Sequence, residues 1–258
     1  SVGATGNALM AAVNANGATT IKNAAKEPEI EALCHFLLKM GAGIKGIGTD
    51  EIIIVGQDKL NADIEYSVIP DRIEAGTFLI AGASTHGDIS VTNINPNHLE
   101  IVLNYLTEAG FNLDVQNDSI RIYPSQNYIN PVDMITGIYP GFPTDLQAQW
   151  MALMMLANGN SKITEEIYTD RFTHIAELTR FGAQVTLSGN IAKILGTNKL
   201  TGAPVMSTDI RASASLIIAA LSAKGKSSIS RIYHIDRGYE NIEGKFNILG
   251  AHIKRIKE

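Results

Sequence analysis

Residues 146–159 read LQAQWMALMMLANG, a run that is apolar or small on nearly every helical face and ends in a glycine. A helix without a polar face is usually buried, because no side of it suits contact with water. Three other runs share this character, and a short extended segment with an isoleucine follows each of the four. The four runs end in Ala15-Asn16-Gly17, Thr85-His86-Gly87, Ala157-Asn158-Gly159 and Ala223-Lys224-Gly225. The sequence therefore indicates a repeated structural unit.

Each copy continues in the same order, with a polar loop, a second amphipathic helix and two short strands. The second helices stop at glycines, which suit the left-handed conformation of a helix C-terminal cap. These glycines are Gly41, Gly110, Gly182 and Gly250. Turns such as Gly48-Thr49-Asp50 join the two strands that follow, as in a hairpin. The copies recur every 66 to 72 residues, so we predict a βαβαββ pattern that is present four times.

The first helix of each copy is predicted to lie buried at the centre of its domain. These helices are expected over residues 7–13, 77–83, 146–157 and 212–223. An extended run precedes the later ones, for example residues 64–69 or Pro204–Met206, whereas the first copy begins abruptly at Ser1. We therefore expect the leading strand of the first copy to be missing and the chain to be part of something longer.

The composition is that of a globular protein, with 45% hydrophobic and 18% charged residues among 258. The net charge of −5 comes without a Lys/Arg run, so neither nucleic acid nor an anionic membrane surface is an expected partner. The apolar stretches are far shorter than the roughly 18 residues of a membrane span. The single cysteine, Cys34, cannot form an internal disulfide, which favours a reducing compartment. We expect a cytoplasmic protein.

Acidic residues stand before the first helices of three copies. Asp71, Asp145 and Asp209 are placed where a carboxylate caps a helix or interacts favourably with its dipole. The alternative is that one of them is a general base. Arg171 and Arg237 precede the second helices, where a cation opposes the helix dipole unless an anion binds there. From the sequence alone, these residues can be ordinary helix-start residues or part of a functional site, and both interpretations are kept.

Three other signals carry no function. Residues 41–46 fit a dinucleotide-binding glycine pattern, but they follow a helix and enter a hairpin, the reverse of the required context. Cys34 lies among leucines on a helix and is predicted to be a buried structural thiol. The six histidines have no metal-ligand spacing, so neither a metal nor a cofactor is expected.

Four segments of the chain resemble signatures of the UDP-N-acetylglucosamine 1-carboxyvinyltransferase family. They are residues 1–5 (SVGAT), 142–149 (FPTDLQAQ), 207–216 (STDIRASASL) and 231–240 (RIYHIDRGYE). The resemblance covers the whole chain, and segments of this length in this order are highly specific. Members transfer the enolpyruvyl group of phosphoenolpyruvate to the 3-hydroxyl of UDP-N-acetylglucosamine, the first committed step of peptidoglycan synthesis.

The resemblance implies an α/β fold of two inside-out α/β barrels, each built of three βαβαββ units, with the substrates between them. Residues 1–69 would then be the last unit of the first domain, and residues 70–258 nearly all of the second. The expected partners are the two substrates and the missing N-terminal part of the same enzyme.

The resemblance also implies roles for individual residues. Asp145 matches the candidate base for the attacking hydroxyl, and Arg211 and Arg237 match arginines that grip phosphoenolpyruvate. The remaining matches are substrate-binding positions at the diphosphate, the sugar or the cleft: Ser1, Val2, Gly3, Glu27, Thr144, Ile167, Arg171 and Asp209. These roles are chemically reasonable, because arginines neutralise phosphate and carboxylate groups and a nearby carboxylate can accept a hydroxyl proton.

Some family features are not found in the chain. The mobile-loop cysteine and a Lys-Asn pair of the family belong upstream, Cys34 does not replace that cysteine, and Gly6 stands where an acid is expected. We therefore expect the isolated chain to be inactive. Two alternatives are retained, namely the related enolpyruvyl transferase that binds shikimate 3-phosphate and a non-catalytic UDP-sugar-binding fragment. Direct binding of each ligand would separate them.

Overall fold

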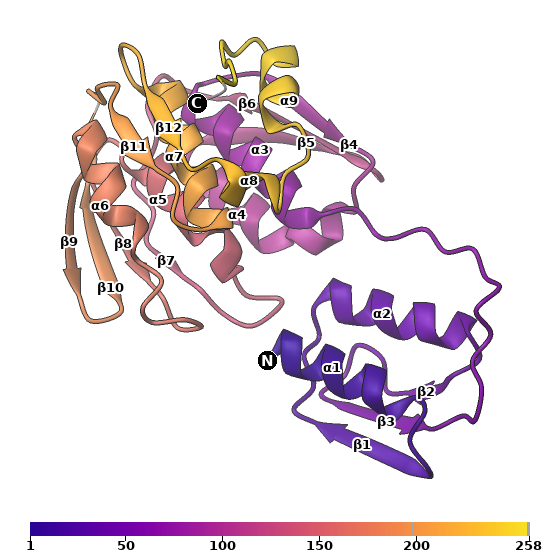
Figure 1. Ribbon diagram of the computed structural model, residues 1–258. Coiled ribbons are helices and arrows are strands. Elements are labelled where there is room, and N and C mark those ends of the chain that lie inside the picture. The colour runs from indigo at the N-terminus through magenta and orange to yellow at the C-terminus, as the bar shows by residue number, and fades with distance from the viewer. Residues whose placement is uncertain (198, 257–258) are drawn as a thin grey trace. The chain divides into compact units, whose positions relative to one another are not determined.

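The computed structural model describes residues 1–197 and 199–256, which form two compact units. The first unit comprises Ser1–Pro70 and the short segment Ile138–Pro140. The second comprises Asp71–Gly137 and the chain from Gly141 onward. Figure 1 shows the helices and strands of both units. In the described part of the chain, no helix combines the length and apolar character needed to cross a membrane.

The first unit packs two helices against a three-stranded antiparallel sheet of order β1-β3-β2. Leu9, Ile30, Cys34 and Ile54 lie in its core. Buried and exposed residues alternate along the central strand of the sheet, as expected for a strand with one face on the core. The elements are α1 (Val2–Ala12), β1 (Ala18–Lys22), α2 (Pro28–Lys39), β2 (Gly43–Lys45) and β3 (Glu51–Val55).

The second unit contains three further copies of the repeat. The second copy along the chain consists of α3 (Arg72–Ser84), β4 (Ile89–Thr92), η1 (Pro96–Leu99), α4 (Glu100–Glu108), β5 (Phe111–Val115) and β6 (Ser119–Pro124). The next consists of β7 (Met134–Ile135), η2 (Thr144–Leu146), α5 (Gln147–Met154), β8 (Asn160–Thr164), α6 (His174–Leu178), η3 (Thr179–Phe181), β9 (Gln184–Ser188) and β10 (Ile191–Leu195). The last consists of β11 (Pro204–Met206), α7 (Ile210–Ser222), β12 (Ser228–Ser230), α8 (Tyr233–Asp236) and α9 (Ile242–Ile248).

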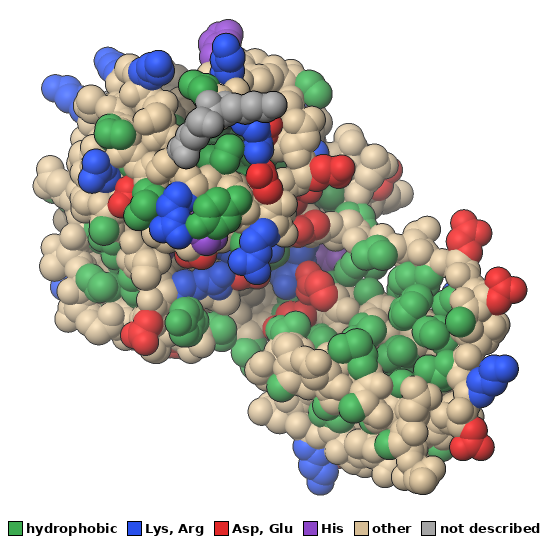
Figure 2. Space-filling view, viewed as in Figure 1, with side chains coloured by type: hydrophobic (Ala, Val, Ile, Leu, Met, Phe, Trp, Pro, Cys, Tyr) green, Lys and Arg blue, Asp and Glu red, His purple; other side chains and the backbone are tan. Residues whose placement is uncertain are grey.

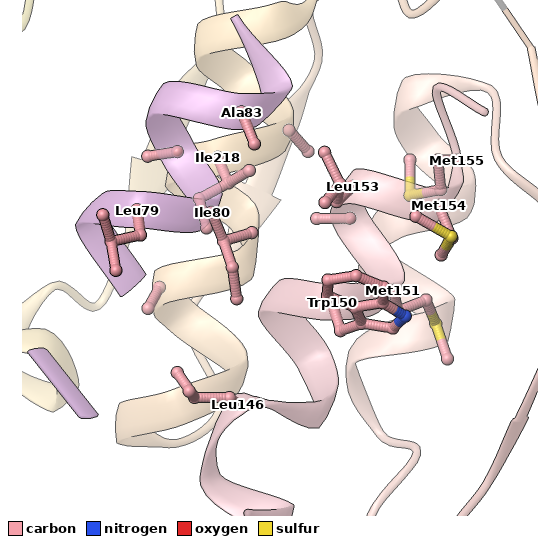
Figure 3. Packing of buried hydrophobic residues seen from close by; sticks show 14 of the residues in the cluster. Leu79, Ile80, Ala83, Leu146, Trp150, Met151, Leu153, Met154, Met155 and Ile218 are labelled. Atoms are coloured by element: carbon pink, nitrogen blue, oxygen red, sulfur yellow. The ribbon is translucent and has the colours of Figure 1, made fainter. Parts of the chain in front are cut away.

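Helices α3, α5 and α7 form the centre of the second unit and pack against one another. Every residue of α5 is buried, and Figure 3 shows Trp150 and Leu153 of α5 packed near Ile80 of α3 and Ile218 of α7. The sheets lie outside these helices (Figure 1) and remain separate in the described residues. The predicted α/β fold of repeated units with central helices is confirmed. These central helices lack a polar face because neighbouring helices cover them.

The pairing of strands shows the same repeat. In three copies the strand after the first helix pairs with the last strand of the hairpin, giving β1-β3-β2, β4-β6-β5 and β8-β10-β9. The glycines that end the second helices all have positive φ, at +97°, +98°, +100° and +95° for Gly41, Gly110, Gly182 and Gly250. The predicted hairpins of the first three copies and the glycine caps are therefore confirmed.

The predicted leading strand at residues 64–69 is wrong. Residues 61–70 contain neither helix nor strand, and Val68 is 84% exposed. The leading strands of the next two copies do form, because β7 pairs in parallel with β8 and β11 pairs in parallel with β12. In the second copy, β4 pairs only with β6 among the described strands. A strand-like sequence without a partner does not form a strand.

Two other expectations about the copies are wrong. The described part of the last copy has no hairpin, since residues 251–256 contain no strand. They lie instead beside α8 and α9, where Arg255 binds Asp236 and Glu243. In addition, helix α1 is mostly exposed and buries only Thr5, Leu9 and Ala12. Within the first unit it packs on α2, β1 and β3, and Figure 2 shows apolar side chains on the surface of this smaller unit.

Helices α1 and α3 each begin five residues earlier than expected, because a side chain caps each start. Oγ of Ser1 accepts from the amide of Ala4 at 3.3 Å. The Asp71 carboxylate caps the start of α3 in the same manner. Such caps satisfy backbone N–H groups that the first turn leaves without a partner.

Candidate active site

The first helices of the second unit begin in two different ways. Asp71 and Asp209 cap α3 and α7, since one carboxylate oxygen of each accepts two backbone N–H groups at 2.8 to 3.0 Å. These two residues are therefore helix N-caps, as the first of the two interpretations predicted. Asp145 is different, because a short 3-10 turn comes before α5 and no described backbone N–H donates to its carboxylate. Its carboxylate is therefore free to interact with other groups.

Two arginines contact the Asp145 carboxylate. Oδ1 lies 2.7 Å from Nη2 of Arg171, and Oδ2 lies 3.9 Å from Nε of Arg211. The Nη1 group of Arg171 donates to the hydroxyl of Thr144 at 3.1 Å. The side chains of Asp145, Arg171 and Arg211 are 41%, 24% and 18% exposed. The structure thus gathers four of the candidate residues into one partly accessible cluster, with a carboxylate between two cations.

Arg211 lies over the ring of Tyr239, with its guanidinium carbon 5.5 Å from the ring centroid. Burial acts to lower the pKa of Arg211, but Tyr239, Asp145 and Asp71 outweigh it, so the pKa is raised above its usual value. Nη1 of Arg211 is buried and has no hydrogen-bond partner in the described residues. Arg211 therefore remains cationic and keeps one donor unused, as an anion-binding arginine requires.

A hydrogen-bonded network of buried polar side chains at the centre of the second unit holds the Tyr239 hydroxyl beneath Arg211. It lies 2.9 Å from Oγ1 of Thr77, and Thr77 gives its own proton to the carbonyl of Ile73, so Tyr239 is the donor. Gln149 donates to Thr77 and to the backbone carbonyl of Asp145. Burial raises the pKa of Tyr239 although Arg211 opposes this, so the phenol keeps its proton.

A buried histidine lies beside the arginine cluster. His174 is 2% exposed, and its Nε2 has no hydrogen-bond partner in the described residues. Burial lowers its pKa to about 4, Asp209 acts in the opposite direction, and Arg171 adds to the lowering. At neutral pH the imidazole is therefore uncharged and adds no positive charge to the site.

Arg237 precedes α9, as expected, but α9 begins only at Ile242, so the expectation that Arg237 stands beside a helix N-terminus is wrong. Residues 233–236 form the short helix α8, and Arg237 is its C-terminal cap. A cation is favourable at that end of a helix, so the helix dipole gives no argument for an anion there. Arg237 is exposed and makes no hydrogen bond or ion pair in the described residues. The next residue, Gly238, lies close to Arg211, since a Cβ built on it would be 3.6 Å from Nη1.

The remaining candidates are four residues of the first unit and Ile167. Ser1 is the N-cap of α1, Val2 and Gly3 are its first residues, and Glu27 precedes α2, all in the first unit. Glu27 has a buried Oε2 without a partner in the described residues. Ile167 belongs to the second unit, and its side chain is 43% exposed. Cys34 is fully buried, and burial and the charge of Glu31 raise its pKa to about 11, so its prediction as a structural thiol is confirmed.

Sequence reasoning missed Tyr239, Gln149 and Thr77, and also Glu165, whose carboxylate accepts a hydrogen bond from the Thr144 hydroxyl at 2.9 Å. Tyr239 and Gln149 lie within the segments that carry the family resemblance, and that was their only signal. Glu165 follows β8 directly, but nothing in the sequence distinguishes it from the neighbouring Glu166. Figure 2 shows acidic and basic side chains close together on the visible face of the larger unit.

Comparison with known proteins gives a consistent result. Residues 1–246 match the family described as EPSP synthase (3-phosphoshikimate 1-carboxyvinyltransferase). The chain is 53% identical over 255 residues to a UDP-N-acetylglucosamine 1-carboxyvinyltransferase of a Nitratiruptor species, covering 98% of this chain and 60% of that protein. It is also 53% identical over 257 residues to the protein of that name from Chlorobium chlorochromatii, again covering 60% of it.

Solved structures agree. The enolpyruvyl transferase NikO from Streptomyces tendae superposes with a TM-score of 0.89 at 26% identity, over 98% of this chain and 60% of that one. EPSP synthase from Acinetobacter baumannii, at 18% identity and a TM-score of 0.70 over 93% of this chain and 58% of that one, shares the fold. The chain thus spans about 60% of the length of the curated relatives that it matches. It belongs to the EPSP synthase (3-phosphoshikimate 1-carboxyvinyltransferase) family.

Proposed function

We propose that this chain is the C-terminal part of a UDP-N-acetylglucosamine 1-carboxyvinyltransferase. The observation that carries the proposal is the Asp145 carboxylate between Arg171 and Arg211, 2.7 Å and 3.9 Å away. Such a cluster offers a proton acceptor beside an anion-binding pair, which is what transfer from an anionic donor to a hydroxyl requires. The names of the relatives at 53% identity supply the substrate class.

In the proposed reaction, the 3-hydroxyl oxygen of UDP-N-acetylglucosamine bonds to the enolpyruvyl carbon of phosphoenolpyruvate, and the bond from that carbon to the phosphate oxygen breaks. Asp145 takes the hydroxyl proton, which leaves the site with the phosphate. Arg211 and Arg237 bind the phosphate and carboxylate of phosphoenolpyruvate, since a guanidinium can donate two parallel hydrogen bonds to either group. The unused Nη1 donor of Arg211 supports this role.

Thr144 and Ile167 are proposed to contact the UDP-sugar, and Ser1, Val2 and Gly3 are proposed to hold its diphosphate. Further substrate-binding residues in the proposal are Glu27, Arg171 and Asp209. In this proposal, the first unit is the last βαβαββ unit of one domain and the second unit is most of the other. The start of α1 supports a diphosphate contact, because N–H groups at a helix N-terminus attract anions.

The product would enter peptidoglycan synthesis, and the enzyme would act in the cytoplasm without a metal or cofactor. The single free thiol of Cys34 is in keeping with a reducing compartment.

The test is turnover by the full-length protein that contains this chain. Phosphate release from phosphoenolpyruvate should depend on UDP-N-acetylglucosamine and should not occur with shikimate 3-phosphate in its place. Release with shikimate 3-phosphate alone would replace the proposal with the related activity named in the family description. Binding of the UDP-sugar without any release would support a non-catalytic role.

A further inference from the structure

Glu165 is a fully buried carboxylate at the end of β8. Its two oxygens accept four hydrogen bonds, from Oγ1 of Thr136 at 2.8 Å, Oγ1 of Thr144 at 2.9 Å, and the amides of Ile167 and Tyr168 at 2.9 and 3.0 Å. A buried carboxylate without such bonds would be strongly unfavourable. Residues from three separate segments therefore converge on one side chain that sequence reasoning did not select.

The direction of these hydrogen bonds follows from the second partner of each threonine. Oγ1 of Thr136 accepts from the amide of Glu166 at 2.9 Å, and Oγ1 of Thr144 accepts from Nη1 of Arg171 at 3.1 Å. Each hydroxyl has a single proton, so both protons point to Glu165. Among the described residues, four donors and no acceptor thus surround the carboxylate, which is the arrangement that suits its charged form.

A continuous chain of hydrogen bonds leads from Glu165 to the proposed base. Glu165 fixes the hydroxyl of Thr144, Thr144 then accepts from one nitrogen of Arg171, and the other terminal nitrogen of Arg171 lies 2.7 Å from Asp145. Resting on the proposed function, we propose that Glu165 is a positioning residue that orients Arg171 and Asp145 through Thr144. Through its other oxygen it also fixes the backbone of Ile167, a proposed UDP-sugar contact.

Replacing Glu165 with glutamine tests this chain with little change in side-chain volume. The amide can accept at one atom only and must donate from the other. If the amide nitrogen faces Thr144, the threonine oxygen accepts from it and the hydroxyl proton turns toward Arg171. The hydroxyl proton of Thr144 and the Nη1 proton of Arg171 then point at each other. Arg171 would move away from its place between Thr144 and Asp145. Misplacement of reacting groups by about 1 Å can reduce turnover on the order of a hundredfold.

The experiment compares Glu165→Gln with Glu166→Gln in the full-length protein. Glu166 is the matched control, because it is adjacent, exposed and makes no side-chain hydrogen bond or ion pair in the described residues. We expect Glu165→Gln to lower kcat by about 10- to 100-fold, with the phosphoenolpyruvate KM within about threefold. Glu166→Gln should behave as wild type. Equal kcat for Glu165→Gln and wild type would overturn the inference.

A double-mutant cycle separates positioning from a general loss of structure. If Glu165 acts through Thr144, then Thr144→Val should lower kcat about tenfold in the wild type but by less than about threefold in Glu165→Gln, because the chain is already broken. Independent losses that multiply would contradict the inference. If Glu165→Gln does not fold, the kcat of Thr144→Ser is compared with that of Thr144→Val instead. Only serine keeps the hydroxyl, so Thr144→Ser should retain the higher kcat. Equal kcat for these two would then contradict it.

Failure of the inference and failure of the proposed function give different results. A wild-type protein that releases no phosphate with UDP-N-acetylglucosamine disproves the proposed function and the role of Glu165 together. A wild-type protein that turns over, with Glu165→Gln equally active, disproves only the role of Glu165.

Discussion

The start of α5 and the starts of α3 and α7 show how an aspartate near the start of a helix can take two roles. All three carry an aspartate before a buried helix at the centre of the second unit. The carboxylates of Asp71 and Asp209 accept hydrogen bonds from amides in the first turns of their helices. Asp145 lies within a 3-10 turn whose N-cap is Pro143, and it instead meets Arg171 at 2.7 Å. The difference shows that local backbone geometry decides whether such an acid caps a helix or serves a site.

Asp145→Asn in the full-length protein should have the largest effect. The amide keeps the size of the side chain but cannot accept a proton as a base does, and a positioned base contributes about 10²–10⁴ in rate. We expect kcat to fall by on the order of a hundredfold or more, with the affinity for UDP-N-acetylglucosamine nearly unchanged. Steady-state kinetics and calorimetric binding measure the two quantities. Turnover within a few-fold of wild type would mean that Asp145 is only a helix-start residue, like Asp71.

Arg237→Lys should have an intermediate effect that extends the comparison to the arginines. Arg211 already meets Asp145 and Tyr239, whereas Arg237 is exposed and unpaired in the described residues. A lysine keeps the charge but loses the planar fork that binds carboxylate or phosphate with two hydrogen bonds. We expect the phosphoenolpyruvate KM to rise by about tenfold or more, with UDP-sugar affinity within a few-fold.

The stability of this variant is its control. Replacement of an exposed side chain away from the core usually changes the free energy of unfolding by less than about 0.5 kcal/mol. Arg237 at the end of α8 fits that description. An unchanged phosphoenolpyruvate KM in a folded variant would place the anion site elsewhere in the cluster.

The repeat and the hairpins could be predicted from sequence because their signals are local. A glycine that must adopt positive φ, such as Gly110 at +98°, identifies a helix end without knowledge of the rest of the fold. Burial of the first helices was predicted correctly for α5 but wrongly for α1. Their sequences are both apolar or small, and only neighbouring helices decide whether such a surface is covered.

The site was less predictable because its geometry depends on pairing between distant segments. The resemblance selected Asp145, Arg171 and Arg211, which the structure brings together. It could not show that Glu165 is buried beneath them while Glu166 is exposed. The dipole argument failed for Arg237 because a four-residue helix formed where a loop was expected. Such short elements are stabilised by tertiary contacts and have little local signal.

Asp71→Ala should have the smallest effect and should act on stability alone. Its Oδ1 accepts from the amides of Ile73 and Glu74 at 2.8 and 3.0 Å, and loss of such a cap costs about 1 kcal/mol of unfolding free energy. Asp71→Asn should retain most of it, because asparagine caps helices about as well as aspartate does. Urea unfolding of the three proteins measures the difference, with the slope of the transition as a check that the unfolded state is unchanged. If Asp71→Asn lost as much stability as Asp71→Ala, the charge of Asp71 near Arg211 would be the cause. The contrast between a capping aspartate and Asp145 would then fail.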